Sequence, residues 1–94
     1  VITSGAVEIR KVNQDLHLDG PFTVSSFADT RGGNLVSITK DNTLMFNWDT
    51  SKVKNLSAFT NGTFGSITGT YSVQVMYTLL NETIISPLFY LTVS

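Results

Sequence analysis

Residues 69–75 read Gly-Thr-Tyr-Ser-Val-Gln-Val, and residues 45–49 read Met-Phe-Asn-Trp-Asp. In the first stretch, apolar and polar side chains alternate with a period of two, which is typical of a β-strand with one buried face. The second stretch places the single tryptophan of the chain, Trp48, in an apolar run. We therefore expect two facing strands in which Trp48 and Tyr71 are interior neighbours.

Short apolar runs separated by turn residues continue in both directions from these two stretches. Gly32-Gly33 and Asn61-Gly62 are strong turn signals, Gly20-Pro21 is expected to break the chain, and Pro87 should mark an edge position or a bulge. The remaining turns are expected at Asp41-Asn42 and residues 80–83, and a loop at residues 49–54. The predicted strands cover residues 7–12, 15–19 (a half-buried edge), 22–27, 35–39, 43–48, 56–59, 70–79 and 84–93.

No segment shows a helical period with caps, and turn signals recur at the spacing of about 8–12 residues that is typical of sandwiches. A chain of 94 residues with 41% apolar content can form one hydrophobic core. We therefore predict a single all-β domain over residues 1–94, an immunoglobulin-like antiparallel β-sandwich of about seven strands.

Three of these motifs resemble a known family. Trp48-Asp49, the later Gly69-x-Tyr71-x-Val73-x-Val75 and the closing residues 91–93 (Leu-Thr-Val) are similar to the W-D, G-x-Y-x-V-x-V and V-x-V strands of PKD-type domains of the immunoglobulin-like superfold. The resemblance covers residues 22–93, although Thr50-Ser51-Lys52 replaces the F-G-D part of the family's W-D-F-G-D-G run.

A second resemblance is to the disulfide-free variable-type domain of CD2-like adhesion receptors, which residues 69–75, Asn81-Glu82-Thr83 and the closing strand fit. Both resemblances imply an extracellular binding or spacer module without an active site. A tyrosine two residues after Gly69 could also form a tyrosine corner, in which the Tyr71 hydroxyl bonds a backbone group upstream.

Composition indicates a protein of the cell surface or exterior. The net charge is −1 and only 14% of residues are charged, so the chain has no electrostatic footprint for nucleic acid. After Lys54 the sole charged residue is Glu82, and Ser, Thr, Asn and Gln supply the polar surface. The chain has no cysteine, which excludes thiol catalysis and thiolate metal sites. Because it begins at Val1, we expect a processed chain or an excised domain, and no apolar run is long enough to cross a bilayer.

Two groups of residues invite a site interpretation. Trp48 could stack on a sugar ring, but its apolar run favours a core role. His17 lies between Asp15 and Asp19, and on a strand the three side chains would share one side and could meet at a metal ion; a solvated polar edge that deters strand pairing is the alternative we favour. The sequence shows no nucleophile–base–acid set and no evident carboxylate pair. We therefore predict a non-enzyme with no catalytic, cofactor or metal residues.

Asn55-Leu56-Ser57, Asn61-Gly62-Thr63 and Asn81-Glu82-Thr83 are N-glycosylation sequons. Seven Asn and 23 Ser plus Thr residues give about 1.7 sequons by chance, so three are a small excess. All three fall on predicted turns with little charge around them. Asn55, Asn61 and Asn81 are therefore candidate glycosylation sites.

The expected function is a non-catalytic structural or adhesive module, located extracellularly or on a cell or particle surface. Its partner would be a protein or further copies of itself, contacted through the turns at residues 29–34, 49–54 and 80–83. Two alternatives stay open. One is a carbohydrate-binding module. The other is a filament or pilus subunit in which residues 1–12 leave as an exchangeable strand and complete a neighbouring copy.

Overall fold

The structure is a computed structural model that describes residues 5–41 and 43–94. Strands account for 51% of the described residues and helix for 9%, and every strand pair is antiparallel, so the chain is all-β. Residues 1–4 of the predicted N-terminal arm and Asn42 of the predicted Asp41-Asn42 turn lie outside the described residues. The described elements are β1 (Gly5–Val12), β2 (Leu18–Val24), β3 (Ala28–Asp29), β4 (Gly33–Asn34), β5 (Val36–Ile38), β6 (Leu44–Phe46), α1 (Thr50–Val53), α2 (Ser57–Thr60), β7 (Gly69–Leu79), β8 (Glu82–Ile85) and β9 (Phe89–Val93).

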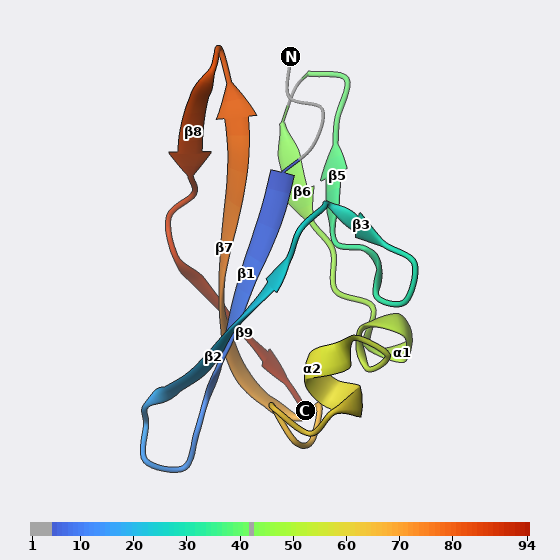
Figure 1. The fold of residues 1–94 in the computed structure, drawn as a ribbon, viewed down its shortest axis with the longest axis vertical. Helices are drawn as coiled ribbons and strands as arrows, with labels where there is room; N and C mark the ends of the chain where they lie inside the picture. The colour runs from blue at the N-terminus through green and yellow to red at the C-terminus, as the bar shows by residue number, and fades with distance from the viewer. Residues whose placement is uncertain (1–4, 42) are drawn as a thin grey trace.

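The largest sheet, called here the principal sheet, is built around β7. Its strand order is β2-β1-β7-β8, and β9 also pairs with β7 (Figure 1). Because Tyr71 and Val73 pair with both β1 and β9, the second partner must lie on the side of β7 opposite β1. The eleven residues of β7, predicted from the alternating sequence as a strand over residues 70–79, therefore form the centre of this sheet.

A bulge divides the return strand into β8 and β9. The pairs Met76–Ile85 and Val73–Phe89 are separated by three residues on β7 (76 to 73) but by four on the other strand (85 to 89). One extra residue therefore sits between them, as in a β-bulge. Ser86 is still paired with Val75, since Ser86 N donates to Val75 O at 2.8 Å and Ser86 Oγ accepts from Val75 N at 2.9 Å, so the bulge lies at Pro87-Leu88. The prediction that Pro87 marks a bulge is confirmed.

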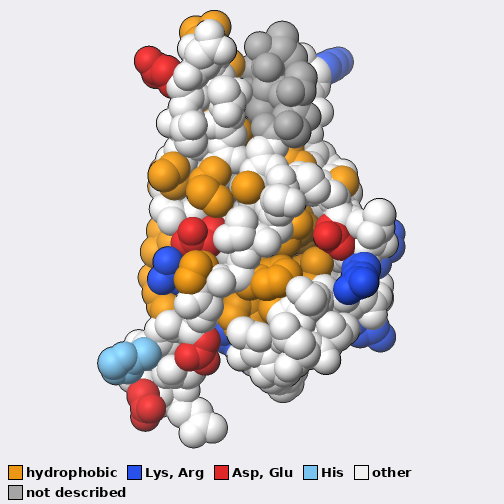
Figure 2. Space-filling view, viewed as in Figure 1, with side chains coloured by type: hydrophobic (Ala, Val, Ile, Leu, Met, Phe, Trp, Pro, Cys, Tyr) orange, Lys and Arg blue, Asp and Glu red, His pale blue; other side chains and the backbone are white. Residues whose placement is uncertain are grey.

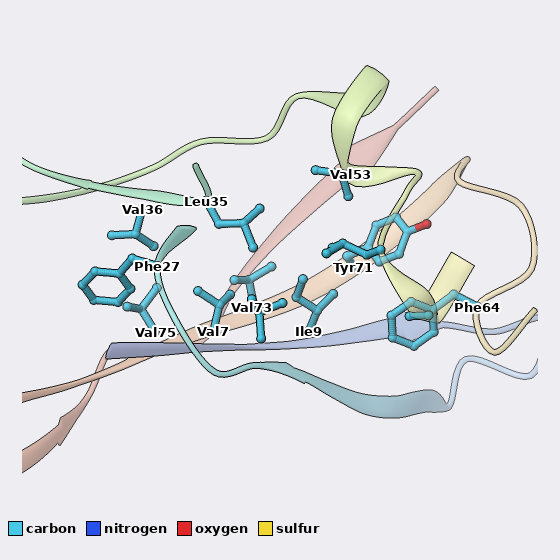
Figure 3. Close-up of a cluster of buried hydrophobic side chains, with 13 residues drawn as sticks. Val7, Ile9, Phe27, Leu35, Val36, Val53, Phe64, Tyr71, Val73 and Val75 are labelled. Carbon is cyan, nitrogen blue, oxygen red and sulfur yellow. The ribbon is translucent and has the colours of Figure 1, made fainter. Parts of the chain in front are cut away.

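The other elements cover one face of the principal sheet. The β3–β4 and β5–β6 hairpins and the two short helices lie beside it in Figure 1. Figure 3 shows Leu35 of this covering layer pointing toward Val7 and Val73 of the sheet. In the same view Val36 lies beside Phe27, and Val53 lies above Tyr71. The buried core is Val7, Ile9, Val24, Phe27, Leu35, Val36, Val53, Leu56, Ala58, Phe64, Tyr71, Val73 and Val75.

Tyr71 is the centre of an aromatic cluster. It is fully buried, and its ring centroid lies 5.1 Å from that of Trp48 and 6.0 Å from those of Phe59 and Phe64. Its hydroxyl donates to Ile67 O at 2.6 Å, a carbonyl four residues upstream. The structure thus confirms that Trp48 and Tyr71 are neighbours and that the Tyr71 hydroxyl bonds the upstream backbone.

Several local predictions were wrong. Residues 49–54, expected as a loop, contain α1, and residues 56–59, expected as a strand, lie largely in α2. Asp49 caps α1, whereas Leu56 and Ala58 are buried by the helical turn instead of by a pleated strand. Gly20-Pro21 lies inside β2, where the β1–β2 register shifts between Ile9 and Lys11, so it interrupts the pairing without ending the strand. Because β2 is an edge strand, a missing N–H is tolerated there. The strand predicted at residues 43–48 ends at Phe46, so Trp48 follows it.

Candidate interaction surface

Two of the three turns expected to contact a partner lie side by side. A Cβ built on Gly33 would lie 2.8 Å from Lys52 Cδ, and one built on Gly32 would lie 2.6 Å from Leu56 Cδ2. The β3–β4 turn therefore packs directly on α1 and on the residue that precedes α2. Gly33 also has φ +79°, a conformation that favours glycine. We call residues 29–34 and 49–54 together the loop–helix surface.

The Asp29 carboxylate organises the first part of this surface. Its Oδ1 accepts the backbone N–H of Gly32 at 3.0 Å and of Arg31 at 2.7 Å. These two bonds, with a smaller contribution from the Arg31 charge, lower the pKa of Asp29 below its usual value. Asp29 is thus ionised at neutral pH and holds the turn in shape.

The Asp49 carboxylate does the same for the second part. Its Oδ1 accepts from Ser51 Oγ at 2.6 Å and from Ser51 N at 3.0 Å, which caps α1. The Ser51 hydroxyl bond is the main cause that lowers the pKa of Asp49. Each of these two carboxylates is bonded within its own turn.

Basic side chains outnumber the two carboxylates on this surface by three to two. Arg31, Lys52 and Lys54 are exposed, and Figure 2 shows Lys and Arg side chains gathered over β3 and α1. Among the described residues, the one ion pair joins Arg10 Nε to Glu8 Oε1 at 3.2 Å, away from this surface. Sequence analysis missed this grouping because Arg31 and Lys52 are far apart in the chain. The Gly32-Gly33 pair, which permits close packing, was the available signal.

The third predicted turn belongs to a different part of the molecule. Leu80 and Asn81 connect β7 to β8 at the end of the sheet remote from α1 (Figure 1). Their φ angles are 51° and 65°, and Leu79 pairs with Glu82, so the connection is a tight two-residue hairpin. The three turns therefore do not form one contact site.

Trp48 lies at the margin of the core. It is half-buried, and its ring lies 6.4 Å from Phe46 in addition to its contact with Tyr71. The indole Nε1 donates to Thr50 Oγ1 at 3.1 Å. Two aromatic neighbours and a satisfied N–H are the environment of a packing residue.

The predicted geometry at His17 was wrong because residues 15–17 are not in a strand. They form the tip of the β1–β2 hairpin, where Leu16 has φ 62° and is 85% exposed. Asn13 Oδ1 accepts from the backbone N–H of Asp15 at 2.9 Å and of His17 at 3.0 Å. Within residues 5–41 and 43–94, no three His, Cys, Asp or Glu side chains are placed to hold a metal ion.

All three sequon asparagines are exposed on connecting segments. Asn55 joins α1 to α2, Asn61 follows α2, and Asn81 lies in the β7–β8 turn. At Asn61 the side-chain Oδ1 accepts from Thr63 N at 2.9 Å and from Thr63 Oγ1 at 2.6 Å, an Asx turn. Their modification stays a prediction.

A surface hollow of about 370 Å³ lies beside the β1–β2 hairpin, and Lys11 is one of the residues that line it. The Lys11 amine donates to Phe64 O at 2.9 Å and also to Ser66 O, and it lies 5.6 Å from the Tyr71 ring centroid. Through these hydrogen bonds Lys11 connects the segment that precedes β7 to β1. In the described part of the chain, no helix has the length and apolarity to cross a membrane.

Comparison with protein-family models, with characterised proteins and with solved structures yields no match for this chain. The protein is an all-β domain with a principal antiparallel sheet.

Proposed function

We propose that this chain is a non-catalytic structural or adhesive module of a surface protein or assembly. It would act outside the cell or on the surface of a cell or particle, as one domain over residues 1–94. Its partner would be a protein, bound through the loop–helix surface.

The proposal includes an immunoglobulin-like β-sandwich as architecture. In this proposal the principal sheet would be one layer and the two hairpins with the helices the other, and the buried core that lies between these elements supports it (Figure 3). The Tyr71–Ile67 bond supports this, because a tyrosine corner is a hallmark of such domains. The strand order differs from that of an immunoglobulin domain, because β1 and β2 lie in the same sheet as β8 and β9. The likeness is therefore one of architecture and not of strand order. We likewise propose the PKD-type resemblance as a likeness of architecture.

The observation that best supports the proposed function is the way in which the loop–helix surface is built. Glycine packing and two carboxylate-bonded turns fix its backbone, so that Arg31, Lys52 and Lys54 are presented on an ordered support. A backbone that is already ordered loses little further entropy on binding. Such a surface suits an acidic or polar protein partner.

The proposed location rests on surface chemistry. From Asn55 onward Glu82 is the only charged residue, and Ser, Thr and Asn form the polar surface. The sequons at Asn55, Asn61 and Asn81 lie on exposed connections, where an acceptor asparagine would have to lie. Trp48 packs against Phe46 and Tyr71, so no specific observation favours the carbohydrate-binding alternative.

The test compares two chemically identical substitutions. The domain is made tetravalent through a tag and applied to intact cells and to extracellular matrix. We expect saturable binding that weakens with added salt and that falls at least tenfold in Lys52→Glu, because the substitution reverses a charge within the loop–helix surface.

Lys40→Glu is the matched control, because Lys40 is exposed but lies in the β5–β6 connection. It should bind like the unsubstituted domain. An equal loss in both variants, or no binding by the unsubstituted tetramer, would contradict the proposed role of this surface.

A further inference from the structure

Of the outer strands of the principal sheet, β2 and β8 are protected against pairing with another chain, whereas β9 is not. The β2 edge contains Pro21, which has no N–H to offer, and the charged Asp19. On the opposite edge, β8 is only four residues long and ends just before the bulge at Pro87. Proline, charge and short length are common means of preventing edge pairing. By contrast, β9 (Phe-Tyr-Leu-Thr-Val) has no proline, glycine or charge, and in the described residues it pairs only with β7.

The direction of the free backbone groups of β9 follows from the ladder. Val75 O accepts from Ser86 N, so the backbone groups of Val75 face the β8–β9 side. Alternate residues of a strand direct these groups to the same side, and the β1–β7 register runs without interruption from Tyr71 to Tyr77. Tyr71 and Val73 therefore bond their β9 partners Leu91 and Phe89. It follows that the N–H and C=O groups of Tyr90 and Thr92 point to the open edge.

The core is also incompletely covered along this edge. The inward side chains of β7, Tyr71 and Val73, are fully buried, whereas Phe89, Leu91 and Val93 beside them on β9 are only half-buried. A further strand at this edge would take apolar area of β9 out of water. The edge thus offers both unpaired backbone groups and an apolar row.

We propose that β9 is a self-association edge, at which two copies of this chain pair antiparallel about a two-fold axis. Since Tyr90 and Thr92 carry the free groups, Tyr90 would bond Thr92 of the second copy and Thr92 would bond Tyr90, with Leu91 opposite its own equivalent. The two principal sheets would become one continuous sheet with both cores on the same side.

The absence of charge suits a second copy of the same edge as the occupant. No charged residue occurs from Thr83 to Ser94, so two identical edges meet without like-charge repulsion. The register also places leucine against leucine on the core side and tyrosine against threonine on the outer side. One five-residue strand is a small contact compared with the roughly 1,000 Å² of stable interfaces, so the dimer should be weak and reversible. It does not depend on what the loop–helix surface binds.

Sedimentation equilibrium over a wide concentration range tests the proposal. The average mass should rise from 10.3 kDa toward twice that value as concentration increases. Thr92→Pro removes an N–H at the open edge but no bond to β7, and should weaken association at least tenfold. Thr92→Val is the matched control: it too loses the Thr70 Oγ1–Thr92 Oγ1 contact of 3.0 Å but keeps the N–H, and should associate normally.

A second variant guards against a folding defect in Thr92→Pro. Tyr90→Lys combined with Thr92→Lys keeps every backbone group and sets lysines opposite lysines, so it too should remain monomeric. A monomeric unsubstituted chain at all concentrations, or association in either edge variant equal to that of the unsubstituted chain, would overturn the proposal.

The register has its own test, because the chain has no cysteine. Residues in a non-hydrogen-bonded antiparallel pair have Cα atoms about 4.5 Å apart, within the range that a disulfide spans. Leu91→Cys should therefore give a cross-linked dimer on mild oxidation much faster than Leu80→Cys, whose position is 87% exposed. Equal cross-linking rates would refute the Leu91–Leu91 register.

Discussion

At the scale of single residues, Tyr71 connects the sequence signature to the fold. Its ring fills the centre of the core, its hydroxyl donates to Ile67 O at 2.6 Å, and the Lys11 amine lies near its face. A buried hydroxyl with a carbonyl partner stabilises the corner before β7, and its removal leaves that carbonyl unsatisfied. We expect Tyr71→Phe to lower the free energy of unfolding by about 1–2 kcal/mol at neutral pH.

The same substitution should change the dependence of stability on alkaline pH. Burial raises the pKa of Tyr71 from its usual 10.0 to about 12. Above pH 10 the unfolded chain releases this proton while the folded protein retains it, so stability falls with rising pH between these two values. Phenylalanine does not titrate. The difference in the free energy of unfolding between the unsubstituted protein and Tyr71→Phe should therefore become smaller as the pH rises through this range.

Urea denaturation at pH 8 to 11.5 measures this narrowing. Tyr90→Phe is the control, because it removes the same hydroxyl from a tyrosine that is 59% exposed and lies outside the buried core. A constant difference between Tyr71→Phe and the unsubstituted protein across this range would show that the Tyr71 hydroxyl does not titrate as its burial requires.

At the scale of elements, the β7–β8 turn contains a residue poorly suited to its backbone. Leu80 has φ 51° and is 87% exposed, so it carries the cost of a left-handed conformation without any burial in return. Asparagine tolerates this conformation, which costs other residues about 1–2 kcal/mol. Leu80→Asn should therefore raise the free energy of unfolding by about 1 kcal/mol with an unchanged urea m-value. Leu80→Val should lower it, and a gain from valine would contradict the argument.

The elements also show what the sequence could and could not predict. β7 was predicted nearly to the residue because its eleven residues follow an apolar–polar alternation in which only Met76 departs from the pattern. The helices were missed because four residues complete about one turn and cannot display a helical period. Leu56 and Ala58 mimic strand alternation, and Asp49 is followed at the third position by Lys52, so the capping box signal is absent. Leu16 is an apolar residue between polar neighbours, yet it lies in a turn. Apolar–polar alternation over a few residues is therefore not sufficient to predict a strand.

The candidate surface was only partly predictable for a related reason. The turns at residues 29–34 and 49–54 were identified individually, but their contact depends on tertiary packing of Gly33 against Lys52. The free edge of β9 likewise became visible only when the ladder showed which strand is outermost. Local patterns indicate turns and strands, whereas the juxtaposition of distant segments is decided by how they share the core.

At the scale of the whole molecule, the position of β1 decides how the filament alternative must work. β1 was expected either to fill its own sheet or to complete a neighbour, and here it lies between β2 and β7 with Val7 and Ile9 fully buried. Removal of residues 1–12 would leave both neighbouring strands without their shared partner and open the core to water. We expect the truncated chain to show no cooperative unfolding transition, as measured by circular dichroism during a urea titration.

Adding the missing strand as a separate peptide turns this loss into a test of strand exchange. If the sheet accepts residues 1–12 from another molecule, the peptide should restore a transition whose midpoint rises with peptide concentration, because binding stabilises the folded state by mass action. A peptide with Val7→Asp and Ile9→Asp is the control and should restore nothing, since it would place charges where the native side chains are 0% exposed. A truncated chain that still unfolds cooperatively would show that β1 is dispensable, whereas loss without rescue by the native peptide would remove the physical basis of a filament joined through β1.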